Sequence, residues 1–344
     1  MRFRKVAIGM SDEIPLCPPI PDRLRLAAKQ GTLIPFIGAG VSQLGGCPGW
    51  EDLASAALRF FVDEGKLSHA QMDQLSSLSA RVKLAVAVGL EQEHDLPIKF
   101  DELLRPPVDH RKELELGNRV YASLSKLAST FVTTNYDDWL DKMPSGLLMA
   151  SGSSASPASD PPGTMRNVIY KLEEFDDEKL KMPNTVVHIH GSVRDRKSMV
   201  LTTSQYLERY RSHRLDGSEG RENSFLTFLE ILFKRKNILF VGYSLSELEV
   251  LEYVVQKARQ DRPRSNEEPR HYILQGFFSH QLELKRSLEA YYRNECGIGL
   301  LAYSRDTQDW RQLVDVVEYL GNEIPSGRIL GLQERLEMEG LLND

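Results

Sequence analysis

The sequence predicts an α/β fold with an open, mainly parallel sheet and helices on both faces. Short apolar runs at residues 32–37, 130–134, 185–190 and 237–241 are typical of buried strands. Stretches with helical periodicity separate these runs, which favours parallel strands joined by helical crossovers. Glycine or polar residues follow each run directly. In such sheets ligands bind beyond the carboxyl ends of the strands, so this edge is the place to look for a site.

Composition narrows the classes of function. The chain has 344 residues, 41% hydrophobic and 27% charged, which fits a globular protein rather than a disordered one. A net charge of -6 gives no general attraction to nucleic acid, and we expect no direct nucleic-acid binding. No apolar window reaches 18 residues, so we expect no membrane span and a cytoplasmic location. Three distant cysteines without a C-x-x-C pair argue against a disulfide framework and a four-thiolate zinc site, and we expect no metal.

The chain divides into an arm, a body and a tail. Residues 1–22 form a proline-rich N-terminal arm, and residues 23–321 form the body. We expect a mostly helical module inserted at about residues 51–128, between the first two strands. Residues 143–167 are rich in Ser, Ala, Pro and Gly and should be a flexible loop, either a linker or a lid. Residues 322–344 carry apolar residues at helical spacing, which suits a tail that binds a second copy or a partner.

The remaining elements are shorter. Further strands are expected at residues 168–170, 199–201, 271–274 and 299–303. Further helices are expected from residue 138 onward and at residues 203–210, 224–233, 248–259, 280–292 and 308–320.

The first strand runs into a glycine turn that ends in a hydroxyl. The relevant residues are Gly38, Ala39, Gly40 and Ser42. Two interpretations stand open: a tight structural corner, or a turn whose N–H groups approach a pyrophosphate. Gln43 stands where a dehydrogenase fingerprint requires its third glycine, and the chain contains no Gly-Lys-Ser/Thr of a Walker loop.

The other strand ends also carry polar residues. Asn135 and Asp137 follow the second strand; either they cap the next helix or they face a ligand. His188 lies deeper in the third strand and is expected to be a core histidine, whereas His190 at its mouth is the candidate for proton transfer. The fourth strand ends at Gly242 and Ser244, which form either a plain turn or a contact to a phosphate or ribose oxygen.

Four motifs in this order resemble the SIR2 (sirtuin-like) NAD-binding fold, a Rossmann-like fold, over about residues 30–305. They are Gly38-Ala39-Gly40-Val41-Ser42, Thr134-Asn135-Tyr136-Asp137, His190-Gly191-Ser192 and Gly242-Tyr243-Ser244-Leu245. The resemblance implies that Gly38, Ala39, Gly40 and Ser42 hold the pyrophosphate of NAD, and that Gly242 and Ser244 hold its adenosine side. It also implies that Asn135 and His190 flank the nicotinamide ribose as catalytic residues and that Asp137 contacts the nicotinamide end.

Departures from the family decide the expected activity. Deacylating sirtuins have four zinc-binding cysteines, which this chain cannot supply, so there is no zinc module. Their Pro-Asp-Phe-Arg segment is replaced here by Pro48-Gly49-Trp50-Glu51. The chain is instead similar to bacterial SIR2-like proteins that hydrolyse NAD as antiphage effectors. That similarity implies an NAD hydrolase, with NAD as substrate, acting in a homo-oligomer with a HerA-type ATPase or another defence partner. A non-catalytic NAD-binding or ADP-ribose-binding subunit is the alternative, and a protein deacylase is a third, less favoured one.

Overall fold

Within the described residues, seven parallel strands form one sheet at the centre of the fold, which confirms the predicted parallel α/β architecture. The computed structural model describes residues 13–106, 111–143, 165–210, 224–243 and 268–324. The strands lie in the order β3-β4-β2-β1-β5-β6-β7, and every adjacent pair is parallel. Their bounds are β1 Leu33–Ile37, β2 Thr130–Thr133, β3 Asn167–Ile169, β4 Thr185–His188, β5 Asn237–Val241, β6 His271–Phe277 and β7 Ile298–Ser304.

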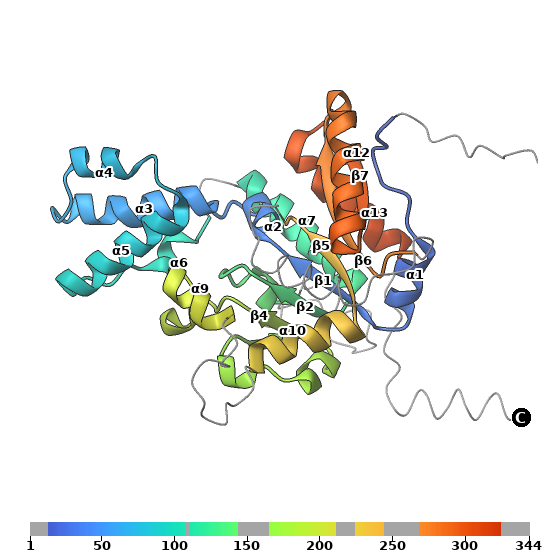
Figure 1. Cartoon of the computed structure of the whole chain (residues 1–344), viewed down its shortest axis with the longest axis horizontal. Helices are drawn as coiled ribbons and strands as arrows, with labels where there is room; N and C mark the ends of the chain where they lie inside the picture. The colour runs from blue at the N-terminus through green and yellow to red at the C-terminus, as the bar shows by residue number, and fades with distance from the viewer. Residues whose placement is uncertain (1–12, 107–110, 144–164, 211–223, 244–267, 325–344) are drawn as a thin grey trace, which may run out of the picture.

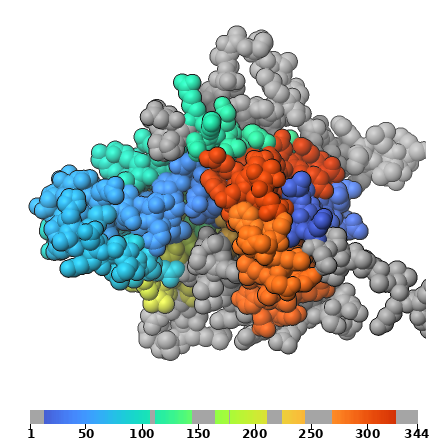
Figure 2. All heavy atoms as spheres, turned by 90° about the horizontal axis from the view of Figure 1, so that it is seen from above, coloured from blue at the N-terminus to red at the C-terminus, as the bar shows by residue number. Residues whose placement is uncertain are grey.

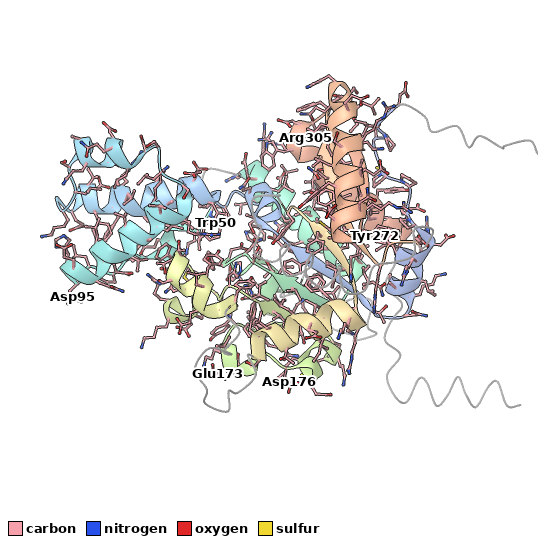
Figure 3. The ribbon with its side chains drawn as sticks, in the orientation of Figure 1. Trp50, Asp95, Glu173, Asp176, Tyr272 and Arg305 are labelled. Atoms are coloured by element: carbon pink, nitrogen blue, oxygen red, sulfur yellow. The ribbon has the colours of Figure 1, made fainter. Side chains whose placement is uncertain are left out.

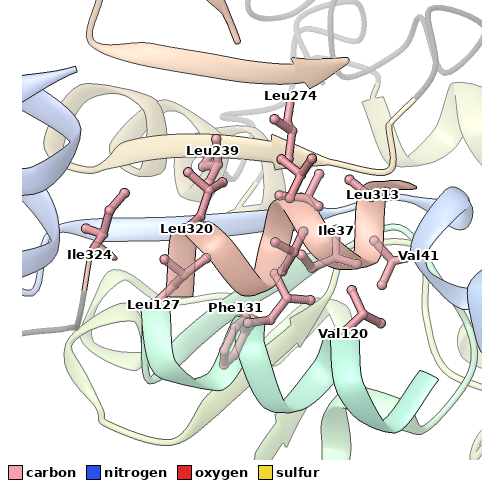
Figure 4. Packing of buried hydrophobic residues seen from close by; sticks show 14 of the residues in the cluster. Ile37, Val41, Val120, Leu127, Phe131, Leu239, Leu274, Leu313, Leu320 and Ile324 are labelled. Atoms are coloured by element: carbon pink, nitrogen blue, oxygen red, sulfur yellow. The ribbon is translucent and has the colours of Figure 1, made fainter. Parts of the chain in front are cut away.

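Helices cover both faces of this sheet. On one face, α1 (Asp22–Lys29), α7 (Arg111–Leu127) and α13 (Gln312–Glu323) pack on alternate strand residues such as Leu33 and Ile37 (Figure 4). On the other face, α10 (Ser224–Arg235) and the π-helical turn Tyr292–Cys296, which follows α12 (Leu282–Tyr291), pack on the intervening ones, such as Ile34 and Phe36. Both sets are fully or nearly buried, which is why the strands read as continuous apolar runs.

The helical module is present, but it is smaller than the sequence suggests. A separate core joins α3 (Trp50–Asp63), α5 (Ala80–His94) and α6 (Phe100–Leu103), with α4 (His69–Leu75) beside them. In Figure 1 these helices, coloured blue to cyan-green, lie to one side of the sheet, and in Figure 2 the blue and cyan atoms form a lobe on the left of the molecule. The last helix expected in the module, α7, instead packs on the sheet. The module core also contains Tyr136, Met199 and Leu201, so it contacts the loops that follow β2 and β4.

Two expected elements do not form. Residues 199–201 are irregular, because the Val200 N–H donates to the His190 carbonyl while the flanking side chains turn into the module core. The helix expected from residue 138 is only a 3-10 turn, Trp139–Asp141. Arg166 binds the carbonyls of Leu140, Asp141 and Lys142, which a continuing helix would have used for itself.

Other predictions differ in detail. A short helix, α2 (Ala39–Leu44), starts inside the glycine turn, whereas the glycine-rich sequence predicts no helix between this turn and residue 51. Helix α9 spans Thr203–Tyr210, as expected. Some predictions lie outside the described residues. These are the helix expected at 248–259, residues 144–164 of the expected loop, residues 1–12 of the arm and residues 325–344 of the tail. Among the described helices, none combines the length and apolar character needed to span a membrane.

Candidate active site at the carboxyl edge of the sheet

The strand register brings four chain segments to one edge. Ile37 of β1 pairs with Thr133 of β2 and with Val241 of β5, and Thr133 pairs with His188 of β4. The segments that follow these residues therefore emerge together. Strand order reverses between β1 and β5, because the chain first builds outward through β2 and later returns to the other side. This reversal is where open α/β sheets bind ligands.

The glycine turn after β1 packs against the turn after β5. The N–H of Gly38 donates to the Val241 carbonyl and that of Gly40 to the Gly242 carbonyl, each at 2.9 Å. A Cβ on Gly38 would lie 2.6 Å from the Gly242 oxygen, and one on Gly40 would lie 2.9 Å from it. Gly242 itself has φ +63°, a conformation that favours glycine. The close backbone contact alone requires these three glycines, so their proposed role toward a pyrophosphate stays a prediction.

A buried polar cluster joins the turn after β1 to the loop after β2. The Asn135 Nδ2 donates to the Gly38 carbonyl at 3.0 Å and to the Ser42 Oγ at 2.7 Å. The Ser42 hydroxyl donates to Asp137 Oδ2 at 2.5 Å. Since a hydroxyl has one proton, the Tyr121 hydroxyl at 3.2 Å must donate to Ser42 in this arrangement. Hydrogen bonds therefore join four predicted site residues: Gly38, Ser42, Asn135 and Asp137.

Asp137 is fixed from two sides. Its Oδ1 accepts the Trp139 N–H at 3.2 Å, a local capping-type bond, while Oδ2 accepts the Ser42 hydroxyl. Burial raises the pKa of this carboxyl, and the bonds from Ser42 and Trp139 oppose that rise. Both interpretations of Asp137 thus have support: it caps the turn that follows, and it also faces the cluster.

The Asn135 side chain has one group left for a ligand. Both amide hydrogens are used, whereas no described residue donates to Oδ1. Asn135 lines a small pocket of about 30 Å³ together with Ala39, Ser42 and Asp137. Such a space holds roughly two water molecules.

Apolar residues also line this pocket. They are Cys47 and Pro48 of the loop before α3, and Trp50, Leu53 and Leu104 of the helical module. Figure 3 shows Trp50 where the module meets the sheet. The Trp50 ring meets the ring of Tyr136 edge-on at 5.6 Å. The pocket thus combines hydrogen-bonding groups with apolar side chains, a pairing that suits a ligand with both kinds of surface.

His190 lies in a different environment, among tyrosines. It is not among the residues that line the pocket. Its Nε2 lies 2.9 Å from the Tyr210 hydroxyl, and its ring meets that of Tyr206 at 5.0 Å. Its Nδ1 is buried without a hydrogen-bond partner in the described part of the chain. Burial, aided by the charges of Arg209 and Arg81, lowers the pKa of His190 to about 3. The ring is therefore neutral near pH 7, the form that can accept a proton.

His188 is a fully buried core histidine, as expected from its depth in the strand. Both of its ring nitrogens have partners: Nδ1 lies 2.8 Å from the Asn135 carbonyl and Nε2 lies 2.8 Å from Asp141 Oδ1. The other oxygen of Asp141 lies 2.6 Å from Arg194 Nε. His188, the predicted core histidine, is therefore hydrogen-bonded to Asn135, a predicted site residue.

The remaining site predictions have no outcome in the structure. Ser244 lies outside the described residues, whereas Gly242 is described as above. Within the described residues there is no group of three or more His, Cys, Asp or Glu residues arranged to hold a metal ion.

Four residues at or beside the site were missed by the sequence analysis: Trp50, Tyr121, Asp141 and Tyr210. Tyr121 and Tyr210 belong to helices whose sequence pattern indicates only that they are amphipathic. Trp50 carried one signal, its place in the segment where the family pattern is lost. The sequence alone does not indicate that Tyr121, Asp141 and Tyr210 lie near the strand ends, because their positions depend on tertiary contacts.

The fold and site define an α/β protein with a polar pocket at the carboxyl edge of a parallel sheet, next to the reversal in strand order. Comparison with known families finds a match to the SIR2-like domain over residues 129–298. This match supports the assignment of the chain to the SIR2-like proteins, with a sirtuin-like, NAD-related fold. It also suggests an NAD-dependent enzyme family. It includes Asn135, Asp137 and His190, while the glycine turn precedes it. No curated protein matches the chain.

Proposed function

We propose that this protein hydrolyses NAD at the nicotinamide glycosidic bond and releases nicotinamide and ADP-ribose. The observation that carries the proposal is the Asn135 amide. Its NH2 group is held by Gly38 and Ser42, and its Oδ1 is left for a ligand in the pocket. An acceptor held in this way can orient a ribose hydroxyl or the attacking water. The SIR2-like match supports NAD as the substrate in this proposal.

The other site residues have distinct roles in this proposal. The bond to the nicotinamide ring breaks through an oxocarbenium-like state, and water adds to the sugar carbon. His190, neutral near pH 7, accepts a proton from a ribose hydroxyl, which requires it and the substrate to meet at the edge of the pocket. Asp137 holds the departing carboxamide, and the turn of Gly38, Ala39, Gly40 and Ser42 lies next to the pyrophosphate. Gly242 and Ser244 contact the adenosine side.

The direct test is an assay for free nicotinamide after incubation of the purified protein with NAD. We expect nicotinamide and ADP-ribose in equal amounts. Binding of NAD without product would favour the alternative, a subunit that binds NAD or ADP-ribose without turnover. Release of an acetyl group from a lysine peptide would favour a deacylase, which the shortage of cysteines disfavours.

We further propose that the protein is an NAD-depleting effector of bacterial antiphage defence, assembled as a homo-oligomer and controlled by a partner such as a HerA-type ATPase. Uncontrolled NAD hydrolysis would harm the host, which is the reason to expect control. The apolar residues at helical spacing in segment 322–344 suit a contact between copies. Native mass measurement of the full chain and of a form lacking residues 322–344 tests this role. A smaller assembly after truncation is expected, and an unchanged mass would count against it.

A further inference from the structure

The main chain of Asn135 is held at both of its polar groups. Its N–H donates to the Thr133 Oγ1 at 3.0 Å, and its carbonyl lies 2.8 Å from His188 Nδ1. Thr133 and His188 face each other across β2 and β4, so the sheet register fixes both partners. Because a carbonyl can only accept a hydrogen bond, Nδ1 of His188 must carry a proton.

The second ring nitrogen of His188 is protonated as well. Nε2 faces Asp141, whose pKa is lowered because its bonds to His188 and Arg194 outweigh its burial. An ionised carboxylate only accepts, so Nε2 must donate to it. The partners of His188 outweigh its burial and raise its pKa, which agrees with an imidazolium ion. Other charges near this pair are those of Asp137 and Arg166.

We propose that His188 is a positioning residue: its Nδ1–H fixes the Asn135 carbonyl and thereby the orientation of the Asn135 side chain in the pocket. This inference rests on the proposed function of Asn135. The bonds from Thr133 and His188 hold the main chain on both sides of the Asn135 Cα and so fix the direction of its Cα–Cβ bond. Without the bond from His188 this direction is less restrained, and Oδ1 shifts in the pocket. Errors of about 1 Å in the placement of a reacting group cost ~10²-fold in rate.

Two substitutions separate the bonds of His188. In His188→Asn, the new amide nitrogen lies two bonds from Cβ, as Nδ1 does, so it can still donate to the Asn135 carbonyl. In His188→Gln, the amide nitrogen lies three bonds from Cβ, as Nε2 does, so it can donate to Asp141 but not to Asn135. Each variant thus keeps one buried partner and loses the other. If His188 only stabilised the fold, kcat would fall by a similar factor in both variants.

We expect His188→Asn to keep kcat for nicotinamide release within a few-fold of wild type. We expect His188→Gln to lower kcat by ~10²-fold with little change in KM, because orientation rather than binding is lost. The unfolding midpoints of the two variants should be similar. Equal kcat values in the two variants would overturn the proposal. The pair His271→Asn and His271→Gln, at a histidine that accepts the Ile238 N–H at the amino end of β6, is the matched control and should leave kcat unchanged.

Thr133→Val keeps the proposal testable if a His188 variant fails to fold. It removes the other bond to the Asn135 main chain, and the bond from the Thr133 hydroxyl to the Ile37 carbonyl, without touching the His188–Asp141 pair, and the side chain keeps its shape. We expect a loss of kcat in the same direction, by ~10-fold, because one of the two bonds remains. An unchanged kcat would show that the orientation of this peptide does not matter.

A readout without activity separates this inference from the proposed function. In protein labelled with 15N-asparagine, the Asn135 side-chain NH2 signal reports its bonds to Gly38 and Ser42. We expect this signal to persist in His188→Asn and to shift or broaden in His188→Gln. If wild type releases no nicotinamide, the proposed function fails, while the NMR result still decides the positioning role. Identical Asn135 signals in both variants would refute it.

Discussion

Replacement of Asn135 by alanine is expected to lower kcat for nicotinamide release by ~10²-fold or more, the loss that follows when a reactant is no longer correctly oriented. The variant loses Oδ1, the acceptor that orients water or a ribose hydroxyl in the pocket. It also removes two hydrogen bonds, to Gly38 and Ser42, which should reduce the free energy of unfolding by about 1–3 kcal/mol. The fold should survive, since the backbone bonds of residue 135 remain.

Asn237→Ala is the matched control for this experiment. Asn237 starts β5 at the opposite edge of the sheet, and its Nδ2 donates to the Thr32 Oγ1. Its loss should lower stability slightly and leave kcat unchanged. Nicotinamide release by Asn135→Ala at the wild-type rate would show that the site has been assigned to the wrong residue. A wild-type level of NAD binding with lost turnover would support a role in the chemical step.

Most of the fold could be predicted from the sequence, because strands of a parallel sheet are buried on both faces and therefore form continuous apolar runs. Runs such as residues 237–241 have no polar interruption, so their ends are easy to locate. The errors occur where tertiary contacts decide. Residues 199–201 have the composition of a strand, yet their side chains are needed in the core of the helical module. Helix α7 was assigned to that module because its amphipathic pattern does not reveal which surface its apolar face covers.

The site, like the fold, could be predicted only in part. Parallel strands place their carboxyl ends together, so Asn135 and Asp137 could be assigned to one edge with the glycine turn. Their actual contacts depend on Ser42, whose hydroxyl takes part in three hydrogen bonds. The Tyr121 hydroxyl reaches that cluster from a helix on the face of the sheet, and no sequence spacing encodes such a contact. His190 shows the same limit, because its tyrosine partners come from helix α9.

Replacement of His190 by alanine is expected to reduce nicotinamide release to near background, by ~10²–10⁴-fold, because the proposed base is lost. Tyr210→Phe removes the hydroxyl that lies 2.9 Å from Nε2 and keeps the ring. We expect it to lower kcat less than His190→Ala, since the histidine remains but its orientation is no longer fixed. Wild-type turnover in His190→Ala would exclude this residue as the base.

The pH dependence of stability provides the control for His190. The folded-state pKa of His190 is about 3, below the ordinary value of 6.5. Below pH 6.5 this histidine takes up a proton in the unfolded chain but not in the folded chain. The free energy of unfolding is therefore unaffected by His190 above pH 6.5 and falls as the pH decreases toward 3. His271 has a pKa of about 3 for the same reason, burial, and lies at the amino end of β6. His190→Ala and His271→Ala should therefore each weaken the loss of unfolding free energy between pH 7 and pH 5, measured by urea titration. Only His190→Ala should abolish turnover, because only His190 stands at the edge of the sheet where the proposed substrate binds.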